Sequence, residues 1–169
     1  MAPEFEPDVI AAVLVKHGVA FIVIGGTAAY LQGSPLLTEG IDVVPDNDRA
    51  NLTRLSAALT ELDARIRSGG EEPLPFGHDA TSLAAAVSWN LTTKHGDLDI
   101  FFQPAGTQGY ADLRREAIAV TLRGTPVLLA SLADIVRSKE AAGRDKDRRV
   151  LPILRELVAD QLRARRPGR

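Results

Sequence analysis

Two aspartates stand inside short apolar segments whose composition predicts β-strands. Asp42 lies in the segment Ile41-Asp-Val-Val44, and Asp99 lies in the segment Leu98-Asp-Ile-Phe-Phe102. Because burial of an unpaired carboxylate is costly, each aspartate must be solvated at a sheet edge, paired with a base or bound to a cation. Magnesium prefers a few carboxylate oxygens together with water and substrate phosphates. Two such carboxylates on neighbouring strands would therefore form a site for a divalent cation, Mg²⁺ or Mn²⁺.

A glycine pair follows another apolar segment, Val19–Ile24, which has the length and β-branched composition of a buried strand. Gly25, Gly26 and Thr27 come directly after it and precede a predicted short helix over residues 28–32. Glycine lets a phosphate group approach the backbone closely, and the first amides of a helix are free to bind an anion. Two interpretations stay open: a phosphate-binding turn, or a tight turn with no part in binding.

The elements that must position these residues follow from the periodicity of apolar side chains. Helical spacing is found around residues 9–14, 52–62, 110–116, 132–142 and 150–162, and strand-like runs are found at 19–24, 41–44, 87–93, 98–102, 118–122 and 127–129. Residues 68–80, with several glycines and prolines, are predicted to form a loop that borders the functional groove.

This order of elements predicts an α/β (α+β) fold in which helices flank one mixed β-sheet. We expect residues 1–130 to form the core and residues 131–169 to form a C-terminal helical segment packed on it, within a single domain overall. The composition agrees with a globular protein, since 45% of the 169 residues are hydrophobic, 25% are charged and none is cysteine. Because the sequence has neither a membrane-spanning apolar run nor a signal-peptide pattern, we expect a cytoplasmic protein without a membrane partner.

The charge is distributed unevenly along the chain. Residues 144–169 hold nine basic and four acidic residues, although the net charge of the whole chain is −2. A basic end on an acidic body is typical of a contact with nucleic acid or with nucleotide phosphates. A solvated surface helix would give the same pattern, so both interpretations stay open.

Together, the glycine turn and the two aspartates resemble the minimal bacterial branch of the nucleotidyltransferase superfamily typified by DNA polymerase β. That superfamily has a Gly-Gly or Gly-Ser turn, then nine to thirteen residues, then Asp-hydrophobic-Asp on a strand and a third carboxylate on a later strand. Here thirteen residues separate Gly26 from Gly40, Asp42 follows at once, and Asp99 is the later carboxylate. The segment Ser131–Asp147 also resembles a helix pair of that family.

The resemblance spans roughly residues 9–160 and implies transfer of a nucleoside monophosphate from a nucleoside triphosphate to an acceptor, with Mg²⁺ or Mn²⁺. The implied residues are Gly25, Gly26, Thr27, Lys139 and Lys146 for the nucleotide, and Asp42 and Asp99 for the metal ion and catalysis. Asp99 would also help to activate the acceptor hydroxyl. The two lysines are equally consistent with surface charge, and we expect Arg144 to pair with Asp147 rather than to act in catalysis.

The acceptor and the partners are implied only by the branch of the family. Toxin–antitoxin nucleotidyltransferases imply an RNA 3′ end, tRNA in particular, and a cognate antitoxin or toxin protein. Antibiotic-modifying relatives imply a small-molecule acceptor instead.

Gly40 departs from the signature, because it stands at the catalytic position where the family has its first metal-binding aspartate. Loss of a carboxylate that bridges two metal ions should cost orders of magnitude in rate. On a strand the side chain of Glu39 would point away from that of residue 40. Three interpretations follow: a natural pseudoenzyme that binds nucleotide or protein, an inactivated form of a harmful enzyme, or a rearrangement that recruits Glu39. We favour the second.

Overall fold

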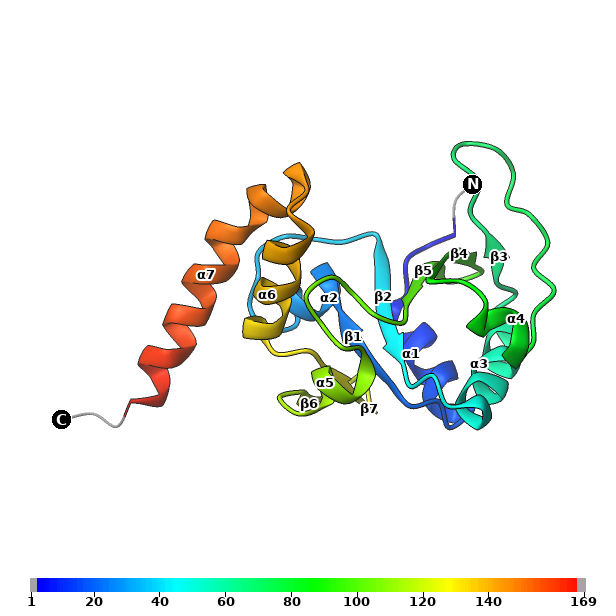
Figure 1. Cartoon of the computed structure of the whole chain (residues 1–169), viewed down its shortest axis with the longest axis horizontal. Helices are drawn as coiled ribbons and strands as arrows, with labels where there is room; N and C mark the ends of the chain where they lie inside the picture. The colour runs from blue at the N-terminus through cyan, green and yellow to red at the C-terminus, as the bar shows by residue number, and fades with distance from the viewer. Residues whose placement is uncertain (1–2, 167–169) are drawn as a thin grey trace.

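Seven strands and seven helices make up residues 3–166, the part of the chain that the computed structural model describes (Figure 1). The strands are β1 (Phe21–Ile24), β2 (Gly40–Pro45), β3 (Arg65–Ile66), β4 (Ser88–Thr93), β5 (Gly96–Phe101), β6 (Ile118–Leu122) and β7 (Thr125–Leu129). The helices are α1 (Pro7–Lys16), α2 (Gly25–Tyr30), α3 (Arg49–Glu61), α4 (Ala80–Ala84), α5 (Tyr110–Arg114), α6 (Leu132–Ala142) and α7 (Asp145–Arg165).

The strands form one mixed sheet in the order β3-β4-β5-β2-β1-β7-β6. At its centre, β2 is antiparallel to β1 and parallel to β5. On one side β7 runs parallel to β1, and on the other side β4 runs antiparallel to β5. The predicted α/β (α+β) fold, a mixed sheet flanked by helices and followed by C-terminal helices, is therefore confirmed.

Alternation along β2 and β5 separates a core face of the sheet from a polar face. Ile41 and Val43 of β2 and Leu98 of β5 are fully buried. Asp42 lies between Ile41 and Val43, and Asp99 follows Leu98. Both aspartates are only partly buried. Successive strand residues point to opposite faces. The apolar residues therefore enter the core, and both aspartates lie on the opposite face.

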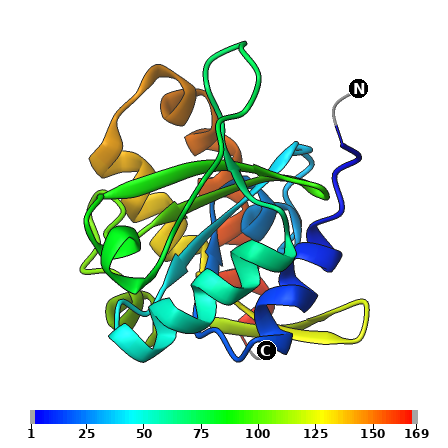
Figure 2. The same cartoon turned by 90° about the vertical axis from the view of Figure 1, so that its right-hand side faces the viewer.

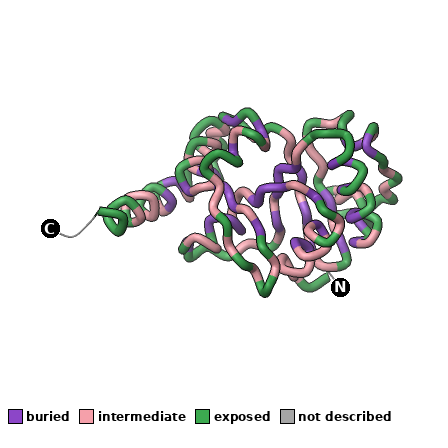
Figure 3. The backbone as a smooth tube through the Cα atoms, turned by 90° about the horizontal axis from the view of Figure 1, so that it is seen from below, coloured by how far each residue is buried: buried purple, intermediate pink, exposed green. Residues whose placement is uncertain are grey.

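Most of the helices lie at two ends of the molecule, and α2 and α5 lie between them (Figure 1). α1, α3 and α4 lie at one end, and α6 and α7 pack against each other at the other end. Gly143 joins these two helices with a left-handed φ of 61°, which favours glycine. The outer part of α7 extends away from the sheet and is largely exposed (Figure 3). Among residues 3–166 no helix is both long and apolar enough to cross a membrane.

Several element boundaries differ from the predicted ones. Strand β5 begins at Gly96 rather than Leu98, so Asp97 belongs to the strand and not to the preceding turn. Helix α7 begins at Asp145, which puts Pro152 in the helix interior rather than in its first turn. The two-residue strand β3 and the five-residue helix α4 were not predicted. Between them, residues 67–79 form the irregular segment that projects from the sheet in Figure 2.

Candidate active site

Asp42 and Asp99 lie side by side on the polar face of the sheet. They are register partners in the parallel pair of β2 and β5, so their side chains leave adjacent strands on the same side. Asp42 is also the register partner of Ile24, the last residue of β1, which puts its carboxylate next to Gly25. Strand pairing thus brings the two aspartates to the glycine turn.

The charged form of these carboxylates is disfavoured. Burial raises the pKa of Asp42 from 3.8 to about 6, and the charge of Asp99 contributes to the rise. The positive charges of Lys139 and Lys146 act in the opposite direction on Asp42. Burial also raises the pKa of Asp99, against the effect of Arg67. Additional positive charge at this point would therefore be stabilising.

Arg67 supplies part of that charge and was not predicted as a site residue. Its guanidinium lies 3.0 Å from a carboxylate oxygen of Asp99 and 3.4 Å from one of Asp97. It also donates a hydrogen bond of 2.9 Å to the carbonyl of Leu91, which fixes its position over β4 and β5. The Oδ1 atom of Asp99 is buried and makes no hydrogen bond among the described residues, although Arg67 is close to it.

The glycine turn packs tightly against β2. Gly25 has a φ of +66°, and a Cβ atom there would lie 2.6 Å from Oδ2 of Asp42. A Cβ atom at Gly26 would lie 2.4 Å from the methyl group of Thr38. Both positions therefore need glycine for a packing reason, whatever they bind.

Thr27 uses its hydroxyl group within the fold. Its Oγ1 donates to the carbonyl oxygen of Gly40 at 2.9 Å and lies 2.8 Å from Oγ1 of Thr38. The side chain is buried. Any contact between Thr27 and a nucleotide in this arrangement would therefore come from its backbone.

Gly40 opens β2 on the same face as Asp42, two residues away. It presents no carboxylate, and its register partner on β5 is Asp97. Glu39 precedes the strand and is exposed. Asp97 lies outside the strand predicted over residues 98–102, but it shares a face with Asp99 because β5 begins at Gly96. The two-residue spacing of these aspartates was the sequence signal for this arrangement.

The basic side of the site comes from α6 and α7. Asp147 is fully buried, accepts hydrogen bonds from the guanidinium and the backbone amide of Arg144, and lies 3.5 Å from Nζ of Lys139. The predicted pairing of Arg144 with Asp147 is confirmed. Lys146 is exposed, but its charge still acts on Asp42. Lys139 therefore lines the cavity next to Asp147, whereas Lys146 is not among the residues that line it.

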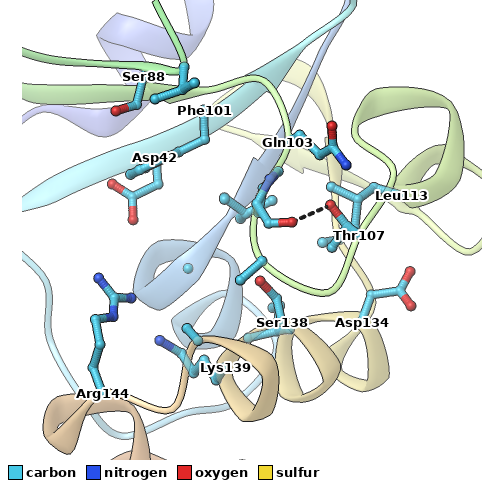
Figure 4. Close-up of a pocket in the computed structure, with 18 residues that line it drawn as sticks. Asp42, Ser88, Phe101, Gln103, Thr107, Leu113, Asp134, Ser138, Lys139 and Arg144 are labelled. Atoms are coloured by element: carbon cyan, nitrogen blue, oxygen red, sulfur yellow. Dashed lines mark hydrogen bonds between the residues drawn. The ribbon is translucent and has the colours of Figure 1, made fainter.

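A cavity of about 400 Å³ separates the sheet from these helices (Figure 4). Figure 4 shows Asp42 on the sheet side and Lys139 and Arg144 on the helix side of the same space. Beyond the charged groups the cavity is lined by Phe101, Leu113 and other apolar side chains, with polar groups from Gln103 and Ser138. Sequence periodicity gave no signal for this lining, because it comes from loops and from several strands and helices that are far apart in the sequence.

The carboxylates at the sheet have the chemistry that a divalent cation needs, but they do not form a complete coordination shell. Asp42 and Asp99 offer carboxylate oxygens, one of which is buried without a hydrogen bond. No three potential metal ligands are arranged around a common point anywhere in residues 3–166. A cation would thus find two adjacent acidic ligands and would need a third group to move, or a substrate phosphate, to complete its coordination.

No protein-family model matches the sequence, and a search of curated proteins likewise finds no match. The structure, in contrast, is similar to solved nucleotidyltransferases over nearly its whole length. One is a protein of Thermotoga maritima, TM1012, assigned to the nucleotidyltransferases: the identity is 16%, the TM-score is 0.56, and 94% of this chain and 97% of that chain are covered.

Two further similar structures have names that refer to antibiotics. The lincosamide antibiotic adenylyltransferase LnuA, solved with lincomycin, is 11% identical with a TM-score of 0.60, covering 92% of this chain and 99% of its own. The antibiotic-resistance factor ANT(2'')-Ia is 14% identical with a TM-score of 0.52, and 94% of each chain is covered. At such identities the likeness shows a shared fold. The chain has a nucleotidyltransferase-like α/β fold.

Proposed function

We propose that this protein transfers a nucleoside monophosphate from a nucleoside triphosphate to an acceptor hydroxyl in the cavity between β2, β5 and α6. The observation that carries the proposal is the opposition of charges across that cavity. Asp42 lines the cavity from the sheet, with Asp99 as its register partner on β5, and Lys139 lines the cavity from α6. A triphosphate needs cationic groups on one side and, with its divalent cation, carboxylates on the other.

The nucleotide would lie with its phosphates between the glycine turn and the helix pair. Gly25 and Gly26 present no side chain there, so phosphate oxygens can approach the backbone. Lys139 and Lys146 would neutralise phosphate charge. The apolar lining around Phe101 would accommodate the nucleoside, since a cavity of about 400 Å³ with few polar groups suits a small ligand.

Asp42 and Asp99 are the residues that would hold Mg²⁺ or Mn²⁺. When bound, such an ion neutralises the triphosphate and polarises the reacting phosphoryl group. Asp99 would accept the proton of the acceptor hydroxyl. The acceptor oxygen then forms a bond to the α-phosphorus, the bond from that phosphorus to the bridging oxygen breaks, and pyrophosphate leaves. Gly40 contributes no ligand, which supports an enzyme of reduced activity.

For the acceptor we propose an RNA 3′ end, with tRNA as the first RNA to test, in a toxin–antitoxin context. The support is the basic character of residues 144–169. Part of this charge is already used, because Arg148 pairs with Asp145 and Arg155 pairs with Glu140. A small-molecule acceptor is the second candidate, and it is favoured by the similarity to LnuA, which is an antibiotic adenylyltransferase.

The test is a labelling assay with each α-labelled triphosphate, Mg²⁺ or Mn²⁺, and either total RNA or a panel of aminoglycosides and lincosamides. We expect label to move to one acceptor class in the wild type and not in Asp42→Asn. Asp160→Asn, which removes an exposed carboxylate on α7, serves as the matched control. Triphosphate binding without transfer to any acceptor would contradict the catalytic proposal and favour a non-catalytic nucleotide-binding module. Absence of triphosphate binding would favour a protein-binding module.

A further inference from the structure

The apolar stripe of α7 continues beyond the part of the helix that the rest of the molecule covers. Leu151 and Leu154 are buried. Val158 and Leu162 follow Leu154 at intervals of four residues, so they lie on the same side of the helix. Leu162 is 57% exposed, and α7 runs away from the sheet at this point (Figure 1, Figure 3). The described part of the chain therefore leaves the last turns of the stripe without cover.

Three arginines surround the end of this stripe. Arg163, Arg165 and Arg166 are all exposed. Arg163 pairs with Asp160 one turn earlier on α7, whereas Arg165 and Arg166 make no ion pair within residues 3–166. The end of α7 thus combines an exposed leucine with an excess of positive charge.

A second cavity, of about 390 Å³, is separate from the candidate active site, since no residue lines both. It lies between residues 4–8, α2, residues 37–38 and the turn that joins β6 to β7, and we call it the α2 groove. Tyr30 and Leu37 line the groove and are 47% and 82% exposed. Large apolar side chains are therefore presented there with little cover from the chain itself.

The α2 groove has an excess of acidic groups. Glu4, Glu6 and Asp8 line it, and Arg123 is the one basic residue that does so within the described chain. Asp8 pairs with Arg123. Glu6 lies 2.8 Å from a ring nitrogen of His95. Glu4 is exposed and makes no ion pair with any described residue, so the groove keeps a net negative charge.

The α2 groove cannot be filled by α7 of the same chain. A Cβ atom at Gly33 would lie 3.6 Å from a methyl group of Leu157, so the middle of α7 passes beside the loop that begins at this glycine. From there α7 stays helical to Arg165 and leaves the sheet (Figure 1). Because a continuous helix does not turn back on itself, its end can enter such a groove only on another molecule.

A second copy of the chain accounts for these features better than nucleic acid does. Phosphates attract arginine, but they give no reason for an exposed leucine in the stripe or for an acidic groove with apolar walls. The two surfaces are complementary in charge and in apolar character, and the same chain carries both. Two copies can therefore satisfy each other's surfaces around a two-fold axis, as in an isologous dimer.

We propose that a second copy of this chain occupies the α2 groove with the end of its α7, so that two copies exchange these helix ends. Leu162 contacts Tyr30 and Leu37 of the other copy, and the arginines of the helix end lie toward the acidic residues of the groove. This inference needs neither a nucleotide nor a metal ion, so it does not depend on the proposed function.

The test is the molar mass of the full chain in solution, measured by sedimentation equilibrium over a range of concentrations. We expect the wild type to approach twice the mass of one chain. Leu162→Glu and Leu37→Glu should each raise the dissociation constant of the dimer at least about tenfold, because each puts a charge into an apolar contact. Leu74→Glu changes a leucine that is 51% exposed outside both surfaces and serves as the matched control.

Folding and charge are tested with the same samples. All three substituted leucines are exposed, so the circular dichroism spectrum and the melting temperature of the monomer should stay as in the wild type. Added salt should weaken the wild-type dimer, because it screens the attraction between the arginines of one copy and the acidic groove of the other.

A mixing experiment tests which surfaces meet. Leu162→Glu chains keep an intact groove, and Leu37→Glu chains keep an intact helix end. An equimolar mixture can therefore form one of the two junctions of the wild-type dimer. We expect the mixture to dimerise more tightly than either variant alone and less tightly than the wild type.

Each other outcome overturns the inference. It fails if the wild type stays monomeric up to roughly 1 mM, or if the dimer is not weakened by both Leu162→Glu and Leu37→Glu. Weakening by both without recovery in the mixture would place the two helix ends against each other instead of in the grooves. A monomeric wild type whose affinity for tRNA falls in Arg165→Glu would identify the helix end as a nucleic-acid surface.

Discussion

Asp42 lines the cavity from the sheet, and Asp147 is buried next to Lys139 and Arg144, which line the cavity from the helix side. The two carboxylates have opposite electrostatic surroundings. Burial alone would raise the pKa of Asp147, but hydrogen bonds from the side chain and backbone of Arg144 lower it below 3.8. At Asp42 burial prevails, and the charge of Asp99 adds to it. The first aspartate is fully compensated within the fold. The second is only partly compensated by Lys139, Lys146 and Arg67, and it lines the cavity.

From this contrast we infer that Asp147 stabilises the fold and that Asp42 has another role. A buried charge that is paired and hydrogen-bonded contributes to a specific structure, and its removal leaves its partners unsatisfied. A half-buried charge beside another charge of the same sign destabilises the folded chain unless a cation is added. Stability measurements on the cation-free protein can therefore distinguish the two regions without an activity assay.

The largest effect is expected for Asp147→Asn. The substitution leaves Arg144 and Lys139 without their common acceptor at the junction of α6 and α7. Because Asp147 is fully buried but Arg144 is more than half exposed, we expect a loss of roughly 2–3 kcal/mol in the free energy of unfolding. Urea unfolding followed by circular dichroism measures this loss. A change below the error of the urea titration would show that the junction does not depend on this pair.

Asp42→Asn should act in the opposite direction when measured in the presence of a chelator. The neutral amide removes both the cost of burying charge and the repulsion from Asp99, so we expect a gain of about 1–2 kcal/mol at pH 7. The same titration with Mn²⁺ present should reduce or reverse the gain, since only the wild type then binds the cation well. Destabilisation in chelator would contradict the comparison.

Lys139→Met removes a positively charged side chain that acts on both Asp147 and Asp42. Its Nζ lies 3.5 Å from Asp147, and its charge also lowers the pKa of Asp42. Because Asp147 keeps Arg144 as its principal partner, we expect a loss of only about 0.5–1 kcal/mol at pH 7. Val136→Met on the same helix serves as the control for a change in apolar volume. A loss as large as that of Asp147→Asn would mean that Lys139, and not Arg144, compensates Asp147.

The smallest effect is the pH dependence of the Asp147 contribution. The folded-state pKa lies below the unfolded value of 3.8, so the stability that this carboxylate contributes is complete above about pH 4. It is lost as the pH falls through the lowered value. The difference in unfolding free energy between wild type and Asp147→Asn should therefore be constant from pH 5 to 7 and should shrink below pH 4. A difference that does not change with pH would contradict the assignment.

The sheet was predictable because its central strands carry an unambiguous pattern. Segments such as Val19–Ile24 and Leu98–Phe102 have too many β-branched and apolar residues to lie at the surface. The two-residue strand β3 was missed because such an element has no periodicity of its own and exists through pairing with β4. The start of β5 was misplaced because Gly96 has the φ of +110° that is typical of a turn, yet it pairs with Thr93.

The candidate site was predictable where it depends on strand residues and not where it depends on loops. The pairing of Asp42 with Asp99 follows from two apolar strands that carry aspartate at equivalent positions. The approach of Arg67 does not, because it follows from a backbone carbonyl at Leu91 and from the path of an irregular segment. Asp97 directly precedes the predicted strand over residues 98–102, so its assignment to β5 depended on where that strand begins. Tertiary contacts decide such boundaries, and local propensity does not.

The hydrogen bond from Thr27 to the carbonyl of Gly40 has a consequence for how the protein can change during evolution. It attaches the main-chain carbonyl at the beginning of β2 to the side chain of Thr27 in α2, so the bond does not depend on which side chain position 40 carries. A side chain at position 40 can therefore change in one mutational step without loss of this hydrogen bond, although a Cβ atom there would lie 3.2 Å from that of Asp97. Crowding between positions 40 and 97 makes a form with aspartate at both positions unfavourable.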